Sequence, residues 1–338
     1  MKAVFKQMIS GVCFIILFCS SVFLHSQTYN DAVAEYNKGA GLMQIPDSVN
    51  AAIRTFNKCL SICQVVGAEA AGVKNTIEPL MPALYDQSAT MLFKANKPDE
   101  AIAGFLLSAE MAKKYNNPKL EAKAKNMVLQ LYISQGNNFL KTNDQSKAMD
   151  YYDRAIAFDP SAAKAYFGKG LILKQQDKPG EFEAIMRKTI SYGIEANDEK
   201  TVIKAREIAR AYFGNKGVAG INNKMYDEAI NQFRLAISFD TTYDEAYFGM
   251  AVAYNELQQW DNAVIMAQKA VYFKVGSDDE KAKIYFELGR AYQGLNDYGN
   301  ACDAYKNALY GKFQKAAELQ RMNVLKCSDV AEPTLPTQ

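Results

Sequence analysis

The stretch YDEAINQFRLA at residues 226–236 returns, with similar spacing of small and large apolar residues, as WDNAVIMAQKA at residues 260–270. Ala229 and Ala263, which hold the same place in the two copies, lie 34 residues apart. Further copies occur near residues 145 and 298. A two-helix repeat of this length is typical of a solenoid, in which each unit buries its apolar face only against its neighbours. The sequence therefore predicts an all-α solenoid of helix-turn-helix units.

Each copy is the second helix of a pair, and the first helix can be identified upstream. In residues 244–277 the first helix carries Tyr247, Met250 and Tyr254, spaced three and four residues apart. This spacing places the large side chains on one helical face, and the small residues near them allow two helices to approach closely. The pattern therefore predicts a buried core and identifies no ligand by itself.

The most complete unit, residues 129–162, carries Tyr132, Gly136, Phe139, Ala148, Tyr152, Ala155 and Pro160. Residues 210–243 carry Phe213, Gly217, Tyr226, Ala229, Phe233 and Ala236, with Thr241 near the place of Pro160. This pattern resembles the tetratricopeptide repeat, whose first helix has Gly or Ala four positions after its opening large residue and whose second helix carries aromatic residues and alanines. The resemblance implies a right-handed superhelix of helix-turn-helix units.

The predicted solenoid covers residues 27–327 in about six units. The clearest units are 129–162, 210–243, 244–277 and 282–315. Farther upstream, Ala52, Ala101 and Ala148 hold equivalent places but lie 49 and 47 residues apart. The N-terminal units are therefore expected to contain longer helices or longer connections.

The C-terminal end is expected to be closed by a single helix. Residues 314–327 are predicted to form a capping helix that covers the last unit, with Ala317, Leu319, Met322 and Leu325 available to face inward. The tail, residues 328–338 with two prolines, is expected to be disordered.

The N-terminus predicts a secretory signal peptide at residues 1–26. Lys2 and Lys6 precede an apolar run from Gly11 to Leu24, and the chain then becomes polar. The run is shorter than the ~20 residues needed to cross a bilayer, so we expect no stable membrane insertion after cleavage. The signal and the Asn-, Lys- and Tyr-rich sequence resemble those of exported bacterial proteins. This predicts a periplasmic, cell-surface or secreted location.

The composition argues against several functional classes. The chain has 39 basic and 37 acidic residues, and loss of the two lysines of the signal leaves a formal charge of zero. We therefore expect no nucleic-acid partner. The only histidine, His25, lies in the signal, so histidine-dependent catalysis and imidazole metal sites are excluded from the mature chain. We expect no cofactor, no metal and no enzymatic activity, with chemistry by paired carboxylates as the enzymatic alternative.

Four cysteines remain in the mature chain, and export would expose them to an oxidising compartment. Cys302 and Cys327 lie on successive predicted helices and could form a disulfide. Cys59 and Cys63 are four residues apart on one predicted helix, a poor geometry for a bridge, so buried thiols are the favoured interpretation.

The recurring sequence AYFG, at 165–168, 211–214 and 246–249, suggests a binding surface. The resemblance implies that the first helices line a concave groove and that the residue after the opening aromatic points into it. The candidate groove residues are Phe167, Phe213, Phe248, Val252, Asn255, Phe286, Arg290 and Gln293. An aromatic stripe of this kind suits an apolar or extended peptide. The alternative interpretation is that the rings belong to the core.

These features predict a non-enzymatic adaptor that binds a segment of a partner protein in the groove. The alternative is a structural, homo-oligomeric envelope protein. A clamp for C-terminal carboxylates, which in similar domains uses Lys and Asn on successive turns of the first helix, is not supported. Asn137 matches that pattern, but Ile133 stands in the lysine position.

Overall fold

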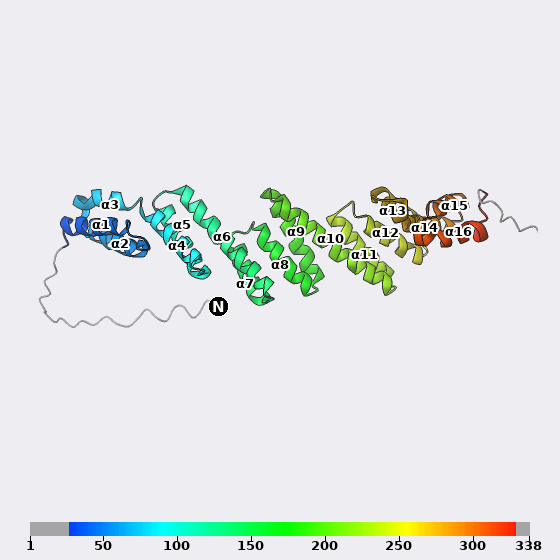
Figure 1. Cartoon of the computed structure of the whole chain (residues 1–338), viewed down its shortest axis with the longest axis horizontal. Coiled ribbons are helices and arrows are strands. Elements are labelled where there is room, and N and C mark those ends of the chain that lie inside the picture. Colours follow the sequence, from blue (N-terminus) through cyan, green and yellow to red (C-terminus); the bar gives the residue numbers. More distant parts are fainter. Residues whose placement is uncertain (1–26, 329–338) are drawn as a thin grey trace, which may run out of the picture. The chain divides into compact units, whose positions relative to one another are not determined.

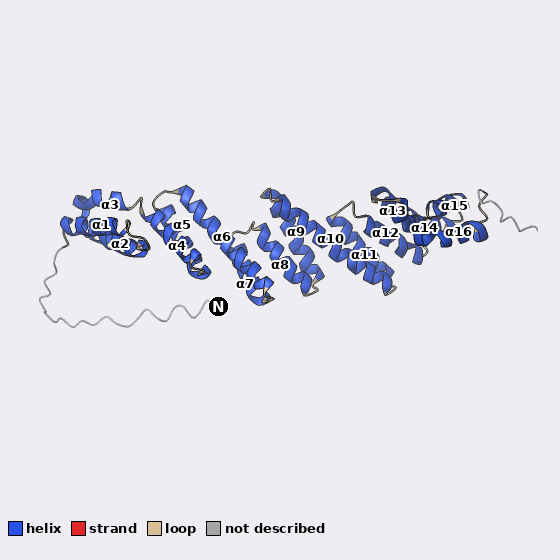
Figure 2. Cartoon of the chain, in the orientation of Figure 1, coloured by secondary structure: helices blue, strands red, loops and turns tan. Residues whose placement is uncertain are grey.

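The structure of the protein, a computed structural model, describes residues 27–328. The predicted signal peptide and residues 329–338 of the predicted disordered tail lie outside the described residues. Within residues 27–328 the regular elements are helices, and no strand occurs in that range (Figure 2). None of the helices in this part of the chain has the length and apolar composition needed to cross a membrane.

The helices form two compact units that divide after Val128. Figure 1 labels the α-helices in chain order. The first unit contains the helices α1 (Tyr29–Leu42), α2 (Val49–Val66), η1 (Gly67–Ala70), α3 (Ala71–Ile77), α4 (Met81–Lys94) and α5 (Pro98–Lys114), and α6 (Pro118–Lys141) runs across the division. Helix α1 packs against α2, and α4 packs against α5. The short helices η1 and α3 separate these two pairs, which explains the long spacing between Ala52 and Ala101.

The second unit continues with regular helical pairs. Its helices are α7 (Gln145–Phe158), α8 (Ala163–Gln175), α9 (Pro179–Glu195), α10 (Glu199–Asn222), α11 (Tyr226–Phe239), α12 (Asp244–Glu256), α13 (Trp260–Phe273), α14 (Asp278–Gly294), α15 (Tyr298–Asn307), η2 (Gly311–Phe313), α16 (Gln314–Leu319) and the π-helical turn η3 (Gln320–Val324). Each second helix of a pair also packs against the first helix of the next pair, and successive first helices contact each other. The solenoid arrangement predicted from the sequence is therefore confirmed.

A close contact between a ring and a glycine recurs in these pairs. The Tyr152 ring lies against Gly136 in α6 and Gly168 in α8, and the Phe233 ring lies against Gly217 and Gly249 in the same way. A Cβ atom added to Gly168 would lie 2.2 Å from Cζ of Tyr152. The glycines therefore allow three helices to meet around one buried ring.

The structure also shows a longer repeat of 81 residues. Helices α5, α6, α7 and α8 have 17, 24, 14 and 13 residues, and α9, α10, α11 and α12 have the same lengths. Each helix of the second set begins 81 residues after its counterpart, as Pro98 and Pro179 illustrate. The turn residues Asn116 and Asn197, also 81 apart, both have positive φ angles. The duplicated unit therefore consists of two helical hairpins. The long hairpin is α5–α6 in the first copy and α9–α10 in the second, and the shorter one is α7–α8 and α11–α12.

The cap differs from the single helix predicted for residues 314–327. The α-helix ends at Leu319 and continues as a π-helical turn to Val324. Ala317 is buried and Leu325 packs against the last core cluster, but Leu319 and Met322 are exposed. The wider turn rotates the side chains that follow Leu319, so the regular α-helical face is not maintained.

The cysteines fall into two classes. Cys302 and Cys327 form a disulfide with Cα atoms 5.9 Å apart, which ties the end of the cap to α15. Cys59 and Cys63 are free and buried. Burial raises the pKa of Cys59 to about 12, and its Sγ donates to the carbonyl oxygen of Ala32 at 3.0 Å. Both thiols therefore behave as core side chains.

We expect Gly168→Ala to lower the free energy of unfolding by about 1–3 kcal/mol, because the added methyl group displaces the Tyr152 ring. Gly180→Ala is the matched control, since no atom lies within 4 Å of its added Cβ. The control should change stability by less than about 0.5 kcal/mol. Urea unfolding of the mature chain measures both, and a Gly168→Ala variant as stable as wild type would show that the contact is not tight.

Reduction of the disulfide should destabilise the C-terminal cap by up to about 3 kcal/mol, because the bond closes a long loop, with a sequence separation of 25. Thermal melting with and without a reductant measures the change. A Cys302→Ser, Cys327→Ser variant should melt like the reduced wild type and should not respond to the reductant. An unchanged melting curve after verified reduction would contradict the expectation.

Candidate functional site

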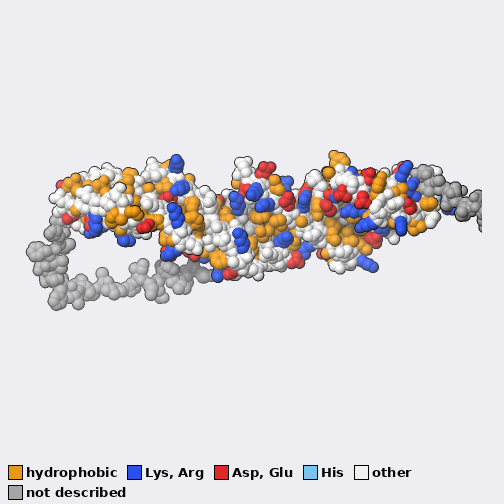
Figure 3. Space-filling view, viewed as in Figure 1, with side chains coloured by type: hydrophobic (Ala, Val, Ile, Leu, Met, Phe, Trp, Pro, Cys, Tyr) orange, Lys and Arg blue, Asp and Glu red, His pale blue; other side chains and the backbone are white. Residues whose placement is uncertain are grey.

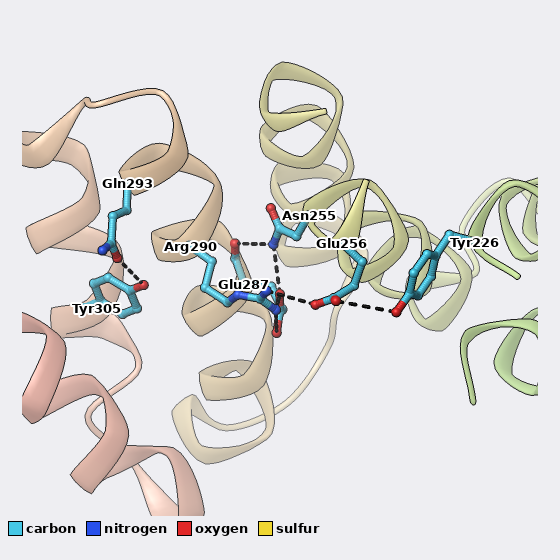
Figure 4. A network of polar contacts seen from close by, with 7 residues as sticks. All are labelled: Tyr226, Asn255, Glu256, Glu287, Arg290, Gln293 and Tyr305. Atoms are coloured by element: carbon cyan, nitrogen blue, oxygen red, sulfur yellow. Dashed lines mark hydrogen bonds and ion pairs between the residues drawn. The ribbon is translucent and has the colours of Figure 1, made fainter. Parts of the chain in front are cut away.

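A polar network joins α11, α12 and α14 on the side of the first helices (Figure 4). Asn255 is only 1% exposed, and its Nδ2 donates to the backbone oxygen of Glu287 at 2.9 Å and to Oε2 of Glu287 at 2.8 Å. Arg290 donates to Oε2 of Glu287 at 3.0 Å and, through Nη2, to Oε1 of Glu256 at 2.9 Å. Tyr226 donates to the other oxygen of Glu256 at 3.4 Å. The network therefore fixes the guanidinium of Arg290.

Glu287 is the least accessible charged group of this network, with its side chain 12% exposed. Burial raises the pKa of Glu287, and the positive charge of Arg290 and the hydrogen bond from Asn255 only partly oppose this effect. The Oδ1 atom of Asn255 is buried and has no hydrogen-bond partner among the described residues. Asn255 thus holds Glu287 in position and leaves one acceptor unused.

A cleft of about 470 Å³ adjoins the network at the C-terminal end of the second unit. It is lined by Trp260, Phe286, Arg290, Gln293, Gly294, Tyr305 and Gln320. The hydroxyl of Tyr305 donates to Oε1 of Gln293 at 3.0 Å, and the rings of Phe286 and Tyr305 are 5.4 Å apart. The Oε1 atom of Gln320 is buried without a hydrogen-bond partner in the described part of the chain. The cleft thus combines aromatic surface with a guanidinium and two amides.

The structure brings together three of the residues that the sequence singled out. Phe286, Arg290 and Gln293 follow one face of α14 and line the same cleft. Val252 is half-buried on α12, and Asn255 is buried in the network. Asn255 therefore supports Glu287 and does not present its side chain to a groove, which corrects its predicted place there.

Phe213 was predicted as a groove residue, and this prediction is wrong. Its side chain is fully buried, with ring contacts to Phe182, Tyr212 and Phe239. The reason is its register. Phe213, in the middle of α10, holds the first large position of the repeat 210–243, four residues before Gly217. This position faces Phe182 and Phe239 of the second helices α9 and α11.

Phe167 and Phe248 are half-buried and pack against core clusters. The ring of Phe248 also lies 4.8 Å from Nζ of Lys283. Phe286 packs against Tyr305 and Phe313. Among the described residues no ring contact links Phe167, Phe248 and Phe286, so they do not form the continuous aromatic stripe that the sequence suggested.

Trp260, Tyr305 and Gln320 line the cleft, and Glu287 belongs to the network, although the sequence did not single them out. Trp260 opens α13 and packs against Gly294, where an added Cβ would lie 2.3 Å from the indole ring. Gln320 belongs to the π-helical turn of the cap. Their position depends on how the cap closes the last pair, and no local spacing in the sequence encodes this. Within the described residues, no group of three or more His, Cys, Asp or Glu side chains is placed to hold a metal ion.

Comparisons with known proteins agree with the repeat architecture. A family model described as tetratricopeptide repeat matches residues 129–161 and 282–310, and a second model with the same description matches residues 245–272. The chain therefore contains tetratricopeptide repeats, and all three matched segments lie in the second unit.

Several curated proteins show partial similarity. The chain is 25% identical over 197 residues to small glutamine-rich tetratricopeptide repeat-containing protein 2 of Saccharomyces cerevisiae, covering 56% of this chain and 54% of that protein. It is 26% identical over 179 residues to the Hsp70-Hsp90 organising protein of Plasmodium falciparum, covering 52% and 28%. It is 25% identical over 180 residues to human DnaJ homolog subfamily C member 7, covering 50% and 35%. The chain thus spans about half the length of these relatives or less.

Solved structures include similar chains at lower identity. A structure of YrrB, described as a tetratricopeptide repeat protein with an unusual peptide-binding site, is 19% identical, covers 57% of this chain and 90% of its own, and has a TM-score of 0.33. A structure of MamA is 18% identical, covers 61% and 98%, and has a TM-score of 0.33.

Replacing Glu287 by glutamine should change how stability depends on pH. Because the folded protein raises the pKa of Glu287, this group favours folding at low pH, and its contribution is lost as pH rises from the ordinary glutamate pKa of 4.5 through the raised value. Wild type should therefore lose stability relative to Glu287→Gln as the pH rises above 4.5.

Urea unfolding of both proteins at several pH values gives this difference. Glu256→Gln is the control for loss of one acceptor of Arg290, since Glu256 is more exposed. A stability difference between wild type and Glu287→Gln that is constant with pH would show that burial does not shift the pKa of Glu287.

Proposed function

We propose that the second unit binds an extended segment of a partner protein and acts as a non-enzymatic adaptor. The cleft of about 470 Å³ next to Arg290 carries this proposal. Its aromatic rings offer contact area with little side-chain entropy to lose, and the polar network holds Arg290 in position before a ligand arrives. The N–H groups of Arg290 that remain beside its contacts to Glu256 and Glu287 suit the backbone carbonyls of an extended peptide.

The proposed partner is not held by a clamp for a C-terminal carboxylate. Asn137, which matches one residue of such a clamp, accepts a hydrogen bond from the Tyr152 hydroxyl at 2.7 Å. Ile133, in the lysine position, offers no charge. Although one relative is named as an organiser of Hsp70 and Hsp90, we therefore propose recognition of an internal segment by the cleft.

We further propose that the protein is exported and works in the bacterial cell envelope. The signal peptide predicted for residues 1–26 supports this location. The Cys302–Cys327 disulfide also supports it, because such bonds persist in oxidising compartments and are rare in the cytosol.

A photo-crosslinking amino acid at Gln293, introduced in native cells, should capture one main partner protein from the envelope fraction. The same amino acid at Tyr272, which is 82% exposed on α13 and does not line the cleft, is the matched control. Arg290→Ala should abolish the adduct at position 293 while leaving the helix content of the protein unchanged.

Identical adducts at the two positions would contradict binding in the cleft. An adduct at position 293 that is found only in the cytoplasm would contradict the proposed location.

A further inference from the structure

A second hollow, of about 750 Å³, lies among α9, α10 and α11 and shares no residue with the cleft. Helix α10 packs against both α9 and α11, and its first half forms the floor between them. We call this hollow the arginine trough. Its lining residues are Arg187, Ile190, Ser191, Arg206, Arg210 and Phe239, with Ile203, Glu207, Ser238 and the loop 240–242 beside them.

Two arginines of the trough, Arg187 on α9 and Arg210 on α10, are already oriented by aromatic rings. The guanidinium of Arg187 lies 4.8 Å from the ring centre of Phe239, and its Nη2 donates to Oγ of Ser238 at 3.0 Å. The guanidinium of Arg210 lies 5.2 Å from the ring centre of Tyr243. Stacking of this kind holds an arginine in place while leaving N–H groups at its edge free to donate.

Three arginines line the trough against two carboxylates, those of Glu207 and Asp240. Asp240 accepts from the backbone nitrogen of Thr242 at 3.0 Å and from its hydroxyl at 2.7 Å, and it also pairs with Arg210. Its carboxylate is therefore already occupied. Arg206 is exposed and has no hydrogen bond or ion pair within residues 27–328. Arg187 also pairs with Glu183, through Nε and Nη2, both at 2.9 Å from Oε1. Since each guanidinium has five N–H groups, these pairings still leave donors without a partner, above all on Arg206.

The 81-residue repeat shows that the fold does not require these arginines. In the first copy, Leu106 occupies the position equivalent to Arg187, and Leu129 occupies the position equivalent to Arg210. Phe158 and Asp159 meanwhile match Phe239 and Asp240. The same long hairpin thus forms with leucines at two positions where the second copy carries positive charge.

Apolar side chains border the arginines. Ile203 is 47% exposed on α10, and Ile190 lies across the trough on α9. Figure 3 shows Lys and Arg side chains beside hydrophobic ones over α9 and α10. A ligand that fits this surface must place negative charge and an apolar group a few ångströms apart.

We propose that the arginine trough binds an acidic segment of a protein, in which carboxylates alternate with apolar side chains. The carboxylates take the unused N–H groups of Arg187, Arg206 and Arg210, and the apolar side chains contact Ile190 and Ile203. This site is independent of the proposed cleft, so the chain can hold two partner segments at once.

The test uses two fluorescein-labelled peptides, GELEGELG and its neutral counterpart GQLQGQLG, with the mature full-length chain. Fluorescence anisotropy should show saturable binding of the glutamate peptide and at least about tenfold weaker binding of the glutamine peptide. Arg206→Glu should weaken binding of the glutamate peptide by about tenfold or more. Lys204→Glu, which makes the same charge change on the exposed surface of α10 outside the trough, should weaken it by less than about threefold.

The double variant Arg187→Leu, Arg210→Leu carries leucine at both positions, as the first copy does. It should fold but should no longer bind the glutamate peptide. Circular dichroism verifies its fold. The proposal is overturned if the glutamate peptide does not bind below about 1 mM, or if Arg206→Glu binds it as wild type does. Displacement by inorganic phosphate, but not by chloride at equal ionic strength, would assign the trough to a phosphate ligand and would also overturn the proposal.

Discussion

The structure depends on the contact between an aromatic ring of a second helix and the glycines of two first helices. The rings of Tyr152 and Phe233 each contact two glycines. One glycine lies in the first helix of the same helical pair, and the other lies in the first helix of the next pair. In the first unit, Phe56 lies against Gly39 in the same manner. A solenoid has no central core, so its stability comes from such contacts between neighbours. The positions of the helices around the cleft and the arginine trough, the two proposed binding surfaces, follow from these ring contacts.

Much of this architecture follows from local sequence. The glycine four residues after an opening aromatic, as in Phe213 and Gly217, predicts both the close helix approach and the register. The same rule explains why Phe213 is core, although its neighbour Tyr212 made the register ambiguous. The 81-residue duplication was harder to recognise, because α9 carries Phe182 and Met186 without the alanines of the regular repeat. The matching helix lengths and turn positions reveal the duplication more clearly than the residues of α9 do.

The lining residues of the two proposed binding surfaces could be predicted only in part. Phe286, Arg290 and Gln293 share a helical face, and their spacing alone places them together. Their partners Trp260, Tyr305 and Gln320 come from three other segments, and the π-helical turn that positions Gln320 has no clear sequence signal. The arginine trough was missed for a related reason. Its residues lie on three helices, and only the comparison with Leu106 and Leu129 distinguishes them from ordinary surface charges.

The central claim is that the second unit holds a partner segment in the cleft beside Arg290. Hydrogen–deuterium exchange of the mature chain, measured with and without the partner captured in the cell, tests this most directly. Binding in the cleft predicts slower exchange in residues 286–294 and 316–324, where backbone on both sides of the cleft becomes protected. Protection confined to the first unit, or to the exposed surface of α13, would contradict the account.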